Sequence, residues 1–98
     1  MTDNATKVER RVRIVNRKGL HARASAKLAR LASTLPAPVF VLRNGDVANA
    51  ISIMDLLMLA AHQGSEVDVC ARGPDAEAAV DAVAEMIADG FGERDEDD

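Results

Sequence analysis

A histidine and an arginine stand two residues apart in the segment GLHARAS, residues 19–25. The segment follows a short loop, NRKG, and begins a stretch in which apolar residues recur at helical spacing. The first backbone N–H groups of a helix lack partners, and the helix dipole adds partial positive charge there. Neutral imidazole is therefore favoured over imidazolium at His21, and its lone pair makes it a nucleophile.

The same helix start suits a phosphoryl group once that group is attached to the ring of His21. Arg23, in the first turn, could donate charge-assisted hydrogen bonds to the phosphoryl oxygens, and its charge further disfavours imidazolium. Gly19 lets the preceding loop approach closely because it has no side chain. The alternative is a helix-capping histidine beside a solvated basic stripe of Arg23, Lys27 and Arg30, and these residues alone leave both interpretations open.

Alternation and helical spacing predict seven elements around this segment. Strands follow from period-2 patterns, helices from amphipathic spacing, and a type I′ hairpin from Asn44-Gly45. In chain order we expect strand 8–15, helix 21–35, two strands within 36–50, helix 52–61, strand 66–72 and helix 74–89. Ser52 is the expected N-cap of the second helix, and Gly64 its expected end. Pro74 is expected in the first helical position of the third helix, with Gly90 as its stop.

This order, β-α-β-β-α-β-α, predicts an α/β two-layer (α+β) open-faced sandwich. A four-stranded antiparallel sheet would carry three helices on one face and leave the other face to water. Arg11 and Arg13 point outward from the first strand, as do Glu66 and Asp68 from the last. Pairing these two strands would bring opposite charges together across the ladder, so we expect them to be neighbours.

The bulk composition describes one small domain. The chain has 98 residues, a net charge of −4, no run of eighteen apolar residues and no basic-plus-hydrophobic leader, so a cytoplasmic protein without a membrane segment is expected. Residues 1–7 are expected to be a flexible tail, 8–90 the domain and 91–98 an acidic tail. One cysteine, Cys70, which is expected on the open side of the sheet, and two distant histidines give little support for a disulfide or a metal site.

Charge is divided unevenly along the chain. Residues 1–35 contain nine basic and two acidic side chains, a net +7, whereas residues 36–98 contain three and fourteen, a net −11. An acidic protein with one basic region fits a docking face for an anionic partner better than it fits nucleic-acid binding. Solvated charge without a partner is the alternative.

The residues also bear on three other function classes: a binding module, an RNA-binding domain and a kinase. A regulatory binding module of split β-α-β type, without phosphorylation, would use His21 only as a cap. An RNA-binding domain is disfavoured because two phenylalanines, with no tyrosine or tryptophan, supply no stacking platform. An autonomous kinase is disfavoured because the sequence has neither a P-loop nor a carboxylate cluster for Mg²⁺.

The segment GLHARAS resembles the active-site pattern G-[IL]-H-x-R-P-[AS] of the HPr family, the histidine-containing phosphocarrier proteins of the bacterial phosphoenolpyruvate-dependent phosphotransferase system. The segment ISIMDLLMLAA, residues 51–61, resembles the second motif of that family, and the element order matches. The resemblance implies that enzyme I passes a phosphoryl group to Nδ1 of His21 and that an enzyme IIA-type protein then takes it. Arg23 would stabilise the phosphoryl group. It implies a stoichiometric carrier that is not an enzyme and needs no cofactor.

The resemblance also assigns roles around the second helix. Ser52 corresponds to a serine that a dedicated kinase/phosphorylase modifies in some members, beside its role as a cap. The helix after it is apolar on nearly every side, and one sheet cannot bury all of these side chains. The resemblance implies that Ile53, Met54 and Leu57 are the exposed ones and form a docking surface, with Lys27 as a further contact. A monomer is expected, and burial of this surface in a homodimer is the alternative.

Three positions depart from the family pattern. Ala24 replaces a proline, which frees a backbone N–H and loosens the helix start. Ile51 and Asp55 replace a lysine and a glycine found in many sugar-branch members. The stretches RNGDVANA and LLML and the ending GFGERDEDD are similar instead to nitrogen-branch carriers. Either branch of the system is therefore open as the destination of the phosphoryl group.

Overall fold

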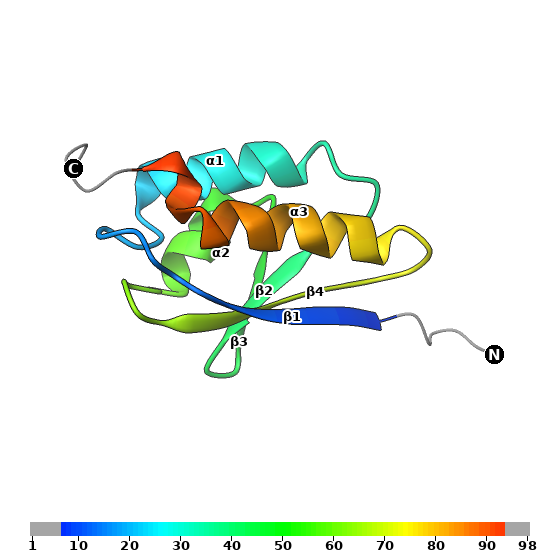
Figure 1. Ribbon diagram of the computed structural model, residues 1–98, viewed down its shortest axis with the longest axis horizontal. Coiled ribbons are helices and arrows are strands. Elements are labelled where there is room, and N and C mark those ends of the chain that lie inside the picture. The colour runs from blue at the N-terminus through cyan, green and yellow to red at the C-terminus, as the bar shows by residue number, and fades with distance from the viewer. Residues whose placement is uncertain (1–6, 94–98) are drawn as a thin grey trace.

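The computed structural model describes residues 7–93. The described chain contains a four-stranded sheet, three α-helices and a short terminal 3₁₀ helix (Figure 1). The elements are β1 (Lys7–Arg13), α1 (Ala22–Ala32), β2 (Phe40–Arg43), β3 (Asp46–Asn49), α2 (Ile53–Met58), β4 (Glu66–Arg72), α3 (Ala76–Ala88) and η1 (Gly90–Gly92).

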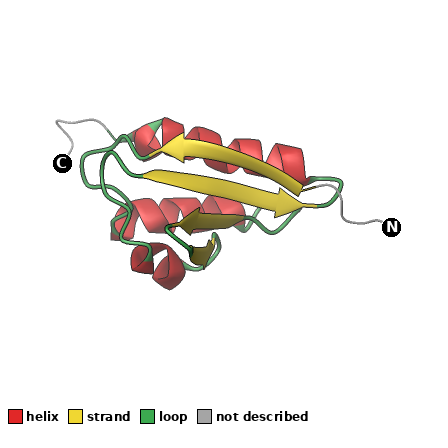
Figure 2. Ribbon diagram, turned by 90° about the horizontal axis from the view of Figure 1, so that it is seen from below, coloured by secondary structure: helices red, strands yellow, loops and turns green. Residues whose placement is uncertain are grey.

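The strands form one antiparallel sheet in the order β1-β4-β2-β3. All three helices lie on one side of it, and the other side is bare, as the view from below shows (Figure 2). This arrangement confirms the predicted open-faced sandwich and its element order. It places the start of α1 at one end of the molecule, where loops and helix ends gather (Figure 1).

The pairing of the first and last strands follows the expected charges. In the β1–β4 register Arg11 lies opposite Asp68 and Arg13 opposite Glu66. The Arg11 Nε atom donates to Asp68 at 3.0 Å, and Arg13 Nη2 donates to Glu66 at 3.4 Å. The predicted adjacency is therefore confirmed, and these ion pairs line the solvent side of the sheet.

The opposite face of the sheet packs under the helices. The alternating residues Val67, Val69 and Ala71 of β4 are buried there, as predicted. The helices contribute small and branched apolar side chains to the same core, among them Ala24, Leu28, Leu56, Val80, Val83 and Ile87. Because α1 and α3 are rich in alanine, their backbones can lie close to the sheet and to each other.

The predicted hairpin is present between β2 and β3. Asn44 and Gly45 have φ angles of 53° and 87°, the two positive values that a type I′ turn requires. Asparagine and glycine accept these angles at lower cost than other residues do. The turn aligns Arg43 with Asp46 and thereby fixes the register of the pair.

Three helix boundaries differ from the predictions. Helix α1 ends at Ala32 rather than residue 35, because Pro36 disfavours helical backbone before it and the Thr34 hydroxyl bonds to the Leu31 carbonyl. Helix α2 ends at Met58, well before Gly64, because the chain turns at Ala60, whose φ is 53°. Helix α3 starts at Ala76 with Asp75 as its N-cap residue, so Pro74 lies outside the helix rather than in its first position.

Both ends of the ordered domain extend beyond the expected boundaries. Lys7, expected in the N-terminal tail, belongs to β1, and the helix η1 extends from Gly90 to Gly92, past the expected domain end at residue 90. Phe91 of η1 is only 3 % exposed, so the chain there packs onto the core instead of starting an acidic tail. The remaining parts of the two expected tails, residues 1–6 and 94–98, lie outside the described residues.

Candidate functional site

His21 occupies the N-cap position of α1. Its backbone is extended, with φ −76° and ψ −179°, and its carbonyl accepts a hydrogen bond from the Ser25 N–H at 2.8 Å. Its side chain makes no capping hydrogen bond to the helix and is 22 % exposed. The ring therefore does not satisfy the helix end, which removes the interpretation of His21 as a side-chain cap.

The ring of His21 instead contacts a carboxylate from the far end of the chain. The His21 Nε2 atom lies 2.6 Å from Glu93 Oε2, and the other carboxylate oxygen accepts from Asn16 Nδ2 at 3.0 Å. The Glu93 side chain is only 6 % exposed. This contact is not predicted from the sequence, in which Glu93 belongs to the expected acidic tail.

Glu93 stays ionised in this setting. Burial works to raise the pKa of the Glu93 carboxyl, but hydrogen bonds from Asn16 and His21, together with the charges of His21 and Lys27, outweigh burial and lower the pKa. An ionised carboxylate can accept hydrogen bonds but cannot donate one. The proton in the His21–Glu93 hydrogen bond therefore belongs to the ring nitrogen.

The loop before His21 is held by close backbone packing. Gly19 has φ 66°, and a Cβ atom there would lie 2.5 Å from the Ala61 oxygen and 2.8 Å from the His62 Cα. The Leu20 N–H donates to the same Ala61 oxygen at 2.9 Å, and Asn16 Nδ2 donates to the Gly19 carbonyl at 2.8 Å. The expected role of Gly19 in close approach is confirmed, and its neighbour is the segment that follows α2.

Two basic side chains of α1, Arg23 and Lys27, differ in their contacts. Arg23 is exposed and makes no hydrogen bond or ion pair with the described residues, so its guanidinium is available to a ligand. Lys27 is half-buried, and its Nζ donates to the Phe91 carbonyl at 3.0 Å. The structure thus brings Lys27 toward the C-terminal segment, a contact that the sequence did not predict.

Helix α2 lies within the second motif, residues 51–61. Ser52 is its N-cap, as predicted, and the Ser52 hydroxyl accepts from the Asp55 N–H at 3.1 Å. The Asp55 carboxylate accepts from the Asn49 N–H rather than closing a capping box on Ser52. Leu56 is buried, whereas Ile53, Met54 and Leu57 are exposed, Met54 to 68 %.

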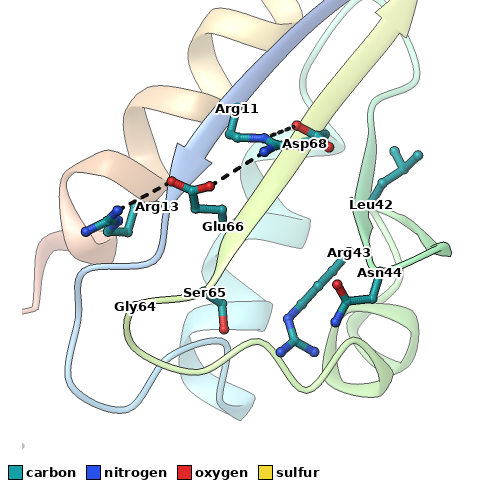
Figure 3. Close-up of a pocket in the computed structure, with 9 residues that line it drawn as sticks. All are labelled: Arg11, Arg13, Leu42, Arg43, Asn44, Gly64, Ser65, Glu66 and Asp68. Atoms are coloured by element: carbon teal, nitrogen blue, oxygen red, sulfur yellow. Dashed lines mark hydrogen bonds and ion pairs between the residues drawn. The ribbon is translucent and has the colours of Figure 1, made fainter.

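A shallow polar hollow lies elsewhere, on the open face of the sheet (Figure 3). Its lining residues are Arg11, Arg13, Leu42, Arg43, Asn44, Gly64, Ser65, Glu66 and Asp68. The close-up shows Arg11 and Arg13 joined to Glu66 and Asp68 by ion pairs. The third arginine of the hollow, Arg43, donates to the Leu59 carbonyl at 3.1 Å, so each arginine that lines the hollow already has a partner within the protein.

No group of three or more histidine, cysteine, aspartate or glutamate side chains within residues 7–93 is placed to hold a metal ion. None of the helices in this part of the chain is long and apolar enough to cross a membrane.

The fold and the site together define a class of small open-faced sandwich proteins with a partly exposed histidine at the start of the first helix. A family model described as the PTS HPr component phosphorylation site matches residues 8–89. The phosphocarrier protein HPr of Cupriavidus necator is 48 % identical over 86 residues, which cover 88 % of this chain and 97 % of that protein. The phosphocarrier protein NPr of Shewanella violacea is 42 % identical over 88 residues, covering 90 % and 97 %.

A solved structure supports the same assignment. The crystal structure of HPr from Thermoanaerobacter tengcongensis superposes with a TM-score of 0.83 at 36 % identity, covering 89 % of this chain and 98 % of that one. The chain therefore belongs to the HPr family. It is a phosphocarrier protein of the phosphotransferase system, as its resemblance implied.

Proposed function

We propose that His21 carries the phosphoryl group, accepting it from phospho-enzyme I and passing it to an enzyme IIA-type protein. The observation that carries this proposal is the partly exposed ring of His21 at the start of α1, with Arg23 two residues away and without a partner within residues 7–93. Free N–H groups at a helix start and a free guanidinium suit a group that gains negative charge on transfer.

Phosphoryl transfer requires the carrier mainly to position its histidine ring and to neutralise charge. Transfer between two histidines moves a phosphoryl group in line from one ring nitrogen to the other, and its barrier falls with positioning and charge neutralisation. We therefore infer a stoichiometric carrier that is not an enzyme in its own right. The proposal needs no cofactor or metal, and it places the exchange in the cytoplasm.

We assign docking to the exposed apolar side of α2. Ile53, Met54 and Leu57 form an apolar surface on this helix, and such surfaces are typical of protein contacts. Lys27 remains a candidate docking cation, although it also bonds to the Phe91 carbonyl. We propose that the protein acts as a monomer, because one surface that meets two partners in turn must be free between encounters.

Ser52 is proposed as a second modification site, for an HPr serine kinase/phosphorylase where one is present. Ser52 is half-buried, and its hydroxyl caps α2. A phosphate there would meet the positive end of that helix and would be tolerated by the fold. The same charge would lie next to Ile53 and Met54 and would disturb docking.

The proposal is tested by incubation with enzyme I and phosphoenolpyruvate, followed by intact mass measurement. We expect the wild type to gain one phosphoryl group that is lost on acid treatment and His21→Ala to gain none. The matched control is His62→Ala, which alters the only other histidine of the sequence and should be phosphorylated like the wild type. Phosphorylation of His21→Ala, or its loss in His62→Ala alone, would contradict the assignment.

A further inference from the structure

Residues 90–93, which follow α3 and are called the hook below, turn back toward the start of α1 (Figure 1). Gly90, Phe91 and Gly92 have φ angles of 68°, 59° and 74°, three left-handed residues in succession. For Phe91 this conformation is sterically unfavourable, and burial of its ring against the core offsets that cost. The result of the turn is that the next residue, Glu93, lies against His21.

Contacts from two other elements hold the hook in place. Lys27 of α1 donates to the Phe91 carbonyl at 3.0 Å. Asn16, in the loop after β1, is buried and donates through Nδ2 both to Glu93 and to the Gly19 carbonyl. One amide group thus ties the carboxylate to the loop that leads into His21. This arrangement fixes the carboxylate more firmly than a contact between two exposed side chains would.

We propose, building on the proposed function, that Glu93 is a positioning residue that holds His21 in the Nε2–H tautomer and thereby makes Nδ1 the nucleophile. The carboxylate contacts Nε2 at 2.6 Å, and no described residue bonds to Nδ1. A hydrogen bond to one ring nitrogen decides which nitrogen of a neutral imidazole keeps the lone pair. The lowered pKa of the Glu93 carboxyl supports an acceptor that is ionised at neutral pH.

Glu93 also balances the charge that the transfer creates. As the Nδ1–P bond forms, the N–P bond of the donor histidine breaks and its electron pair returns to the donor nitrogen. The ring of His21 keeps its proton on Nε2 and becomes positively charged. A carboxylate bonded to that N–H stabilises the positive ring, in the way that a buried carboxylate stabilises an imidazolium in other sites. Arg23 would stabilise the negative phosphoryl oxygens, whereas Glu93 would stabilise the positive ring.

The tautomer is measured directly by the ¹⁵N chemical shifts of the His21 ring in the unphosphorylated protein at a pH where the ring is neutral. We expect nearly pure Nε2–H tautomer in the wild type. In Glu93→Gln the amide can either accept or donate, so the ring should relax to a mixture. Glu85→Gln is the matched control, because Glu85 lies on α3 and makes no side-chain hydrogen bond or ion pair with the described residues.

Two results would overturn the proposal: a wild-type ring with its proton on Nδ1, or a Glu93→Gln ring with the same tautomer ratio as the wild type. An amide ¹H–¹⁵N spectrum verifies that the variant is folded. If the variant does not fold, the tautomer of the wild-type ring alone decides the proposal. The measurement needs no phosphorylation, so it is independent of whether His21 is the acceptor.

Transfer kinetics provide the second readout. We expect Glu93→Gln to slow phosphorylation by enzyme I roughly tenfold, the lower end of the losses seen when a group that orients a metal-binding histidine is removed. Glu85→Gln should transfer at the wild-type rate. If the tautomer shifts but the rate does not, the positioning role is refuted. If the wild type itself accepts no phosphoryl group, the proposed function fails, whatever the tautomer is.

Discussion

At the scale of single residues, the site separates its charges around one imidazole. Glu93 lies at Nε2, while Arg23, two residues along α1, has no partner among the described residues. The proposed transfer would make the His21 ring positive and attach a dianionic phosphoryl group to it. The carboxylate of Glu93 suits the positive ring, and the guanidinium of Arg23 suits the phosphoryl oxygens. The two residues should therefore fail in different ways when replaced.

Replacement of Arg23 by alanine should slow transfer and leave the fold intact. A charge-assisted hydrogen bond to the transferring group is lost, which corresponds to a fall in rate on the order of ten- to a hundredfold. The measurement is single-turnover phosphorylation by enzyme I beside an unfolding curve. Arg30→Ala, an exposed arginine in the last turn of the same helix, is the control. Equal rates for the two variants would remove Arg23 from the site.

Glu93 should make the stability of the protein depend on acid pH. Because its pKa is lower in the folded protein, its ionised form contributes stability above the ordinary value of about 4.3, and this contribution is lost as pH falls through the folded pKa. Lys27 and His21 are the cationic groups facing it. Urea unfolding from pH 7 to about 3 should show Glu93→Gln less stable than the wild type at neutral pH, with the difference shrinking toward acid. A difference that is constant with pH would contradict this linkage.

At the scale of elements, the loop before α1 depends on one glycine. Gly19 has a positive φ, and a Cβ there would collide with the backbone of Ala61 and His62. We expect Gly19→Ala to lower the free energy of unfolding by about 2–5 kcal/mol, the sum of backbone strain and overpacking. Gly45→Ala, also at positive φ but with open space around it, should cost about 1–2 kcal/mol from strain alone.

Urea or thermal unfolding of the two glycine variants checks this difference. Strain is common to both, so the difference between them isolates the clash with residues 61 and 62. Equal losses of stability would show that the loop can move away from the segment after α2. In that case the approach of the two segments would contribute nothing to holding His21.

Elements with strong local signals could be predicted from the sequence. The span of β4 was exact, because alternation and a flanking glycine mark both of its ends. The hairpin is predictable because Asn44-Gly45 between two strands strongly favours a type I′ turn. Helix ends were less accurate, since α2 stops where Ala60 takes a left-handed conformation that nothing in its own type favours.

At the scale of the whole molecule, the open-faced sandwich separates its surfaces. One face of the sheet is covered by charged ladders, and the site lies at one end, where the start of α1 and the terminal hook meet (Figures 1 and 2). The exposed apolar residues of α2 belong to the helical layer. A partner that reaches His21 can therefore contact α2 without touching the open face of the sheet.

Docking through α2 predicts a change in apparent affinity for enzyme I. Met54→Ser removes an exposed apolar side chain, so stability should change little, while KM for transfer should rise by up to about tenfold at an unchanged kcat. Val47→Ser removes a similarly exposed side chain from β3 and is the control. Steady-state phosphorylation by enzyme I measures both variants. An equal effect of the two would refute docking through α2.

The part of the site that sequence reasoning missed is set by tertiary structure. His21 and Arg23 lie in one motif, so their types and spacing pointed to the chemistry directly. Glu93 is 72 residues from His21 in the chain, and its acidic neighbours ERDEDD are typical of a solvated tail. The contact arises only because Phe91 packs on the core and the two glycines beside it turn the chain back, and no local pattern encodes that combination.

The most direct test of the account is to locate the phosphorus atom in the phosphorylated protein. A ¹H–¹⁵N spectrum of the histidine rings, recorded after enzyme I and phosphoenolpyruvate have charged the protein, reports phosphorus–nitrogen coupling at the bonded nitrogen. We expect coupling at Nδ1 of His21. Coupling at Nε2 of His21, or at either nitrogen of His62, would contradict it.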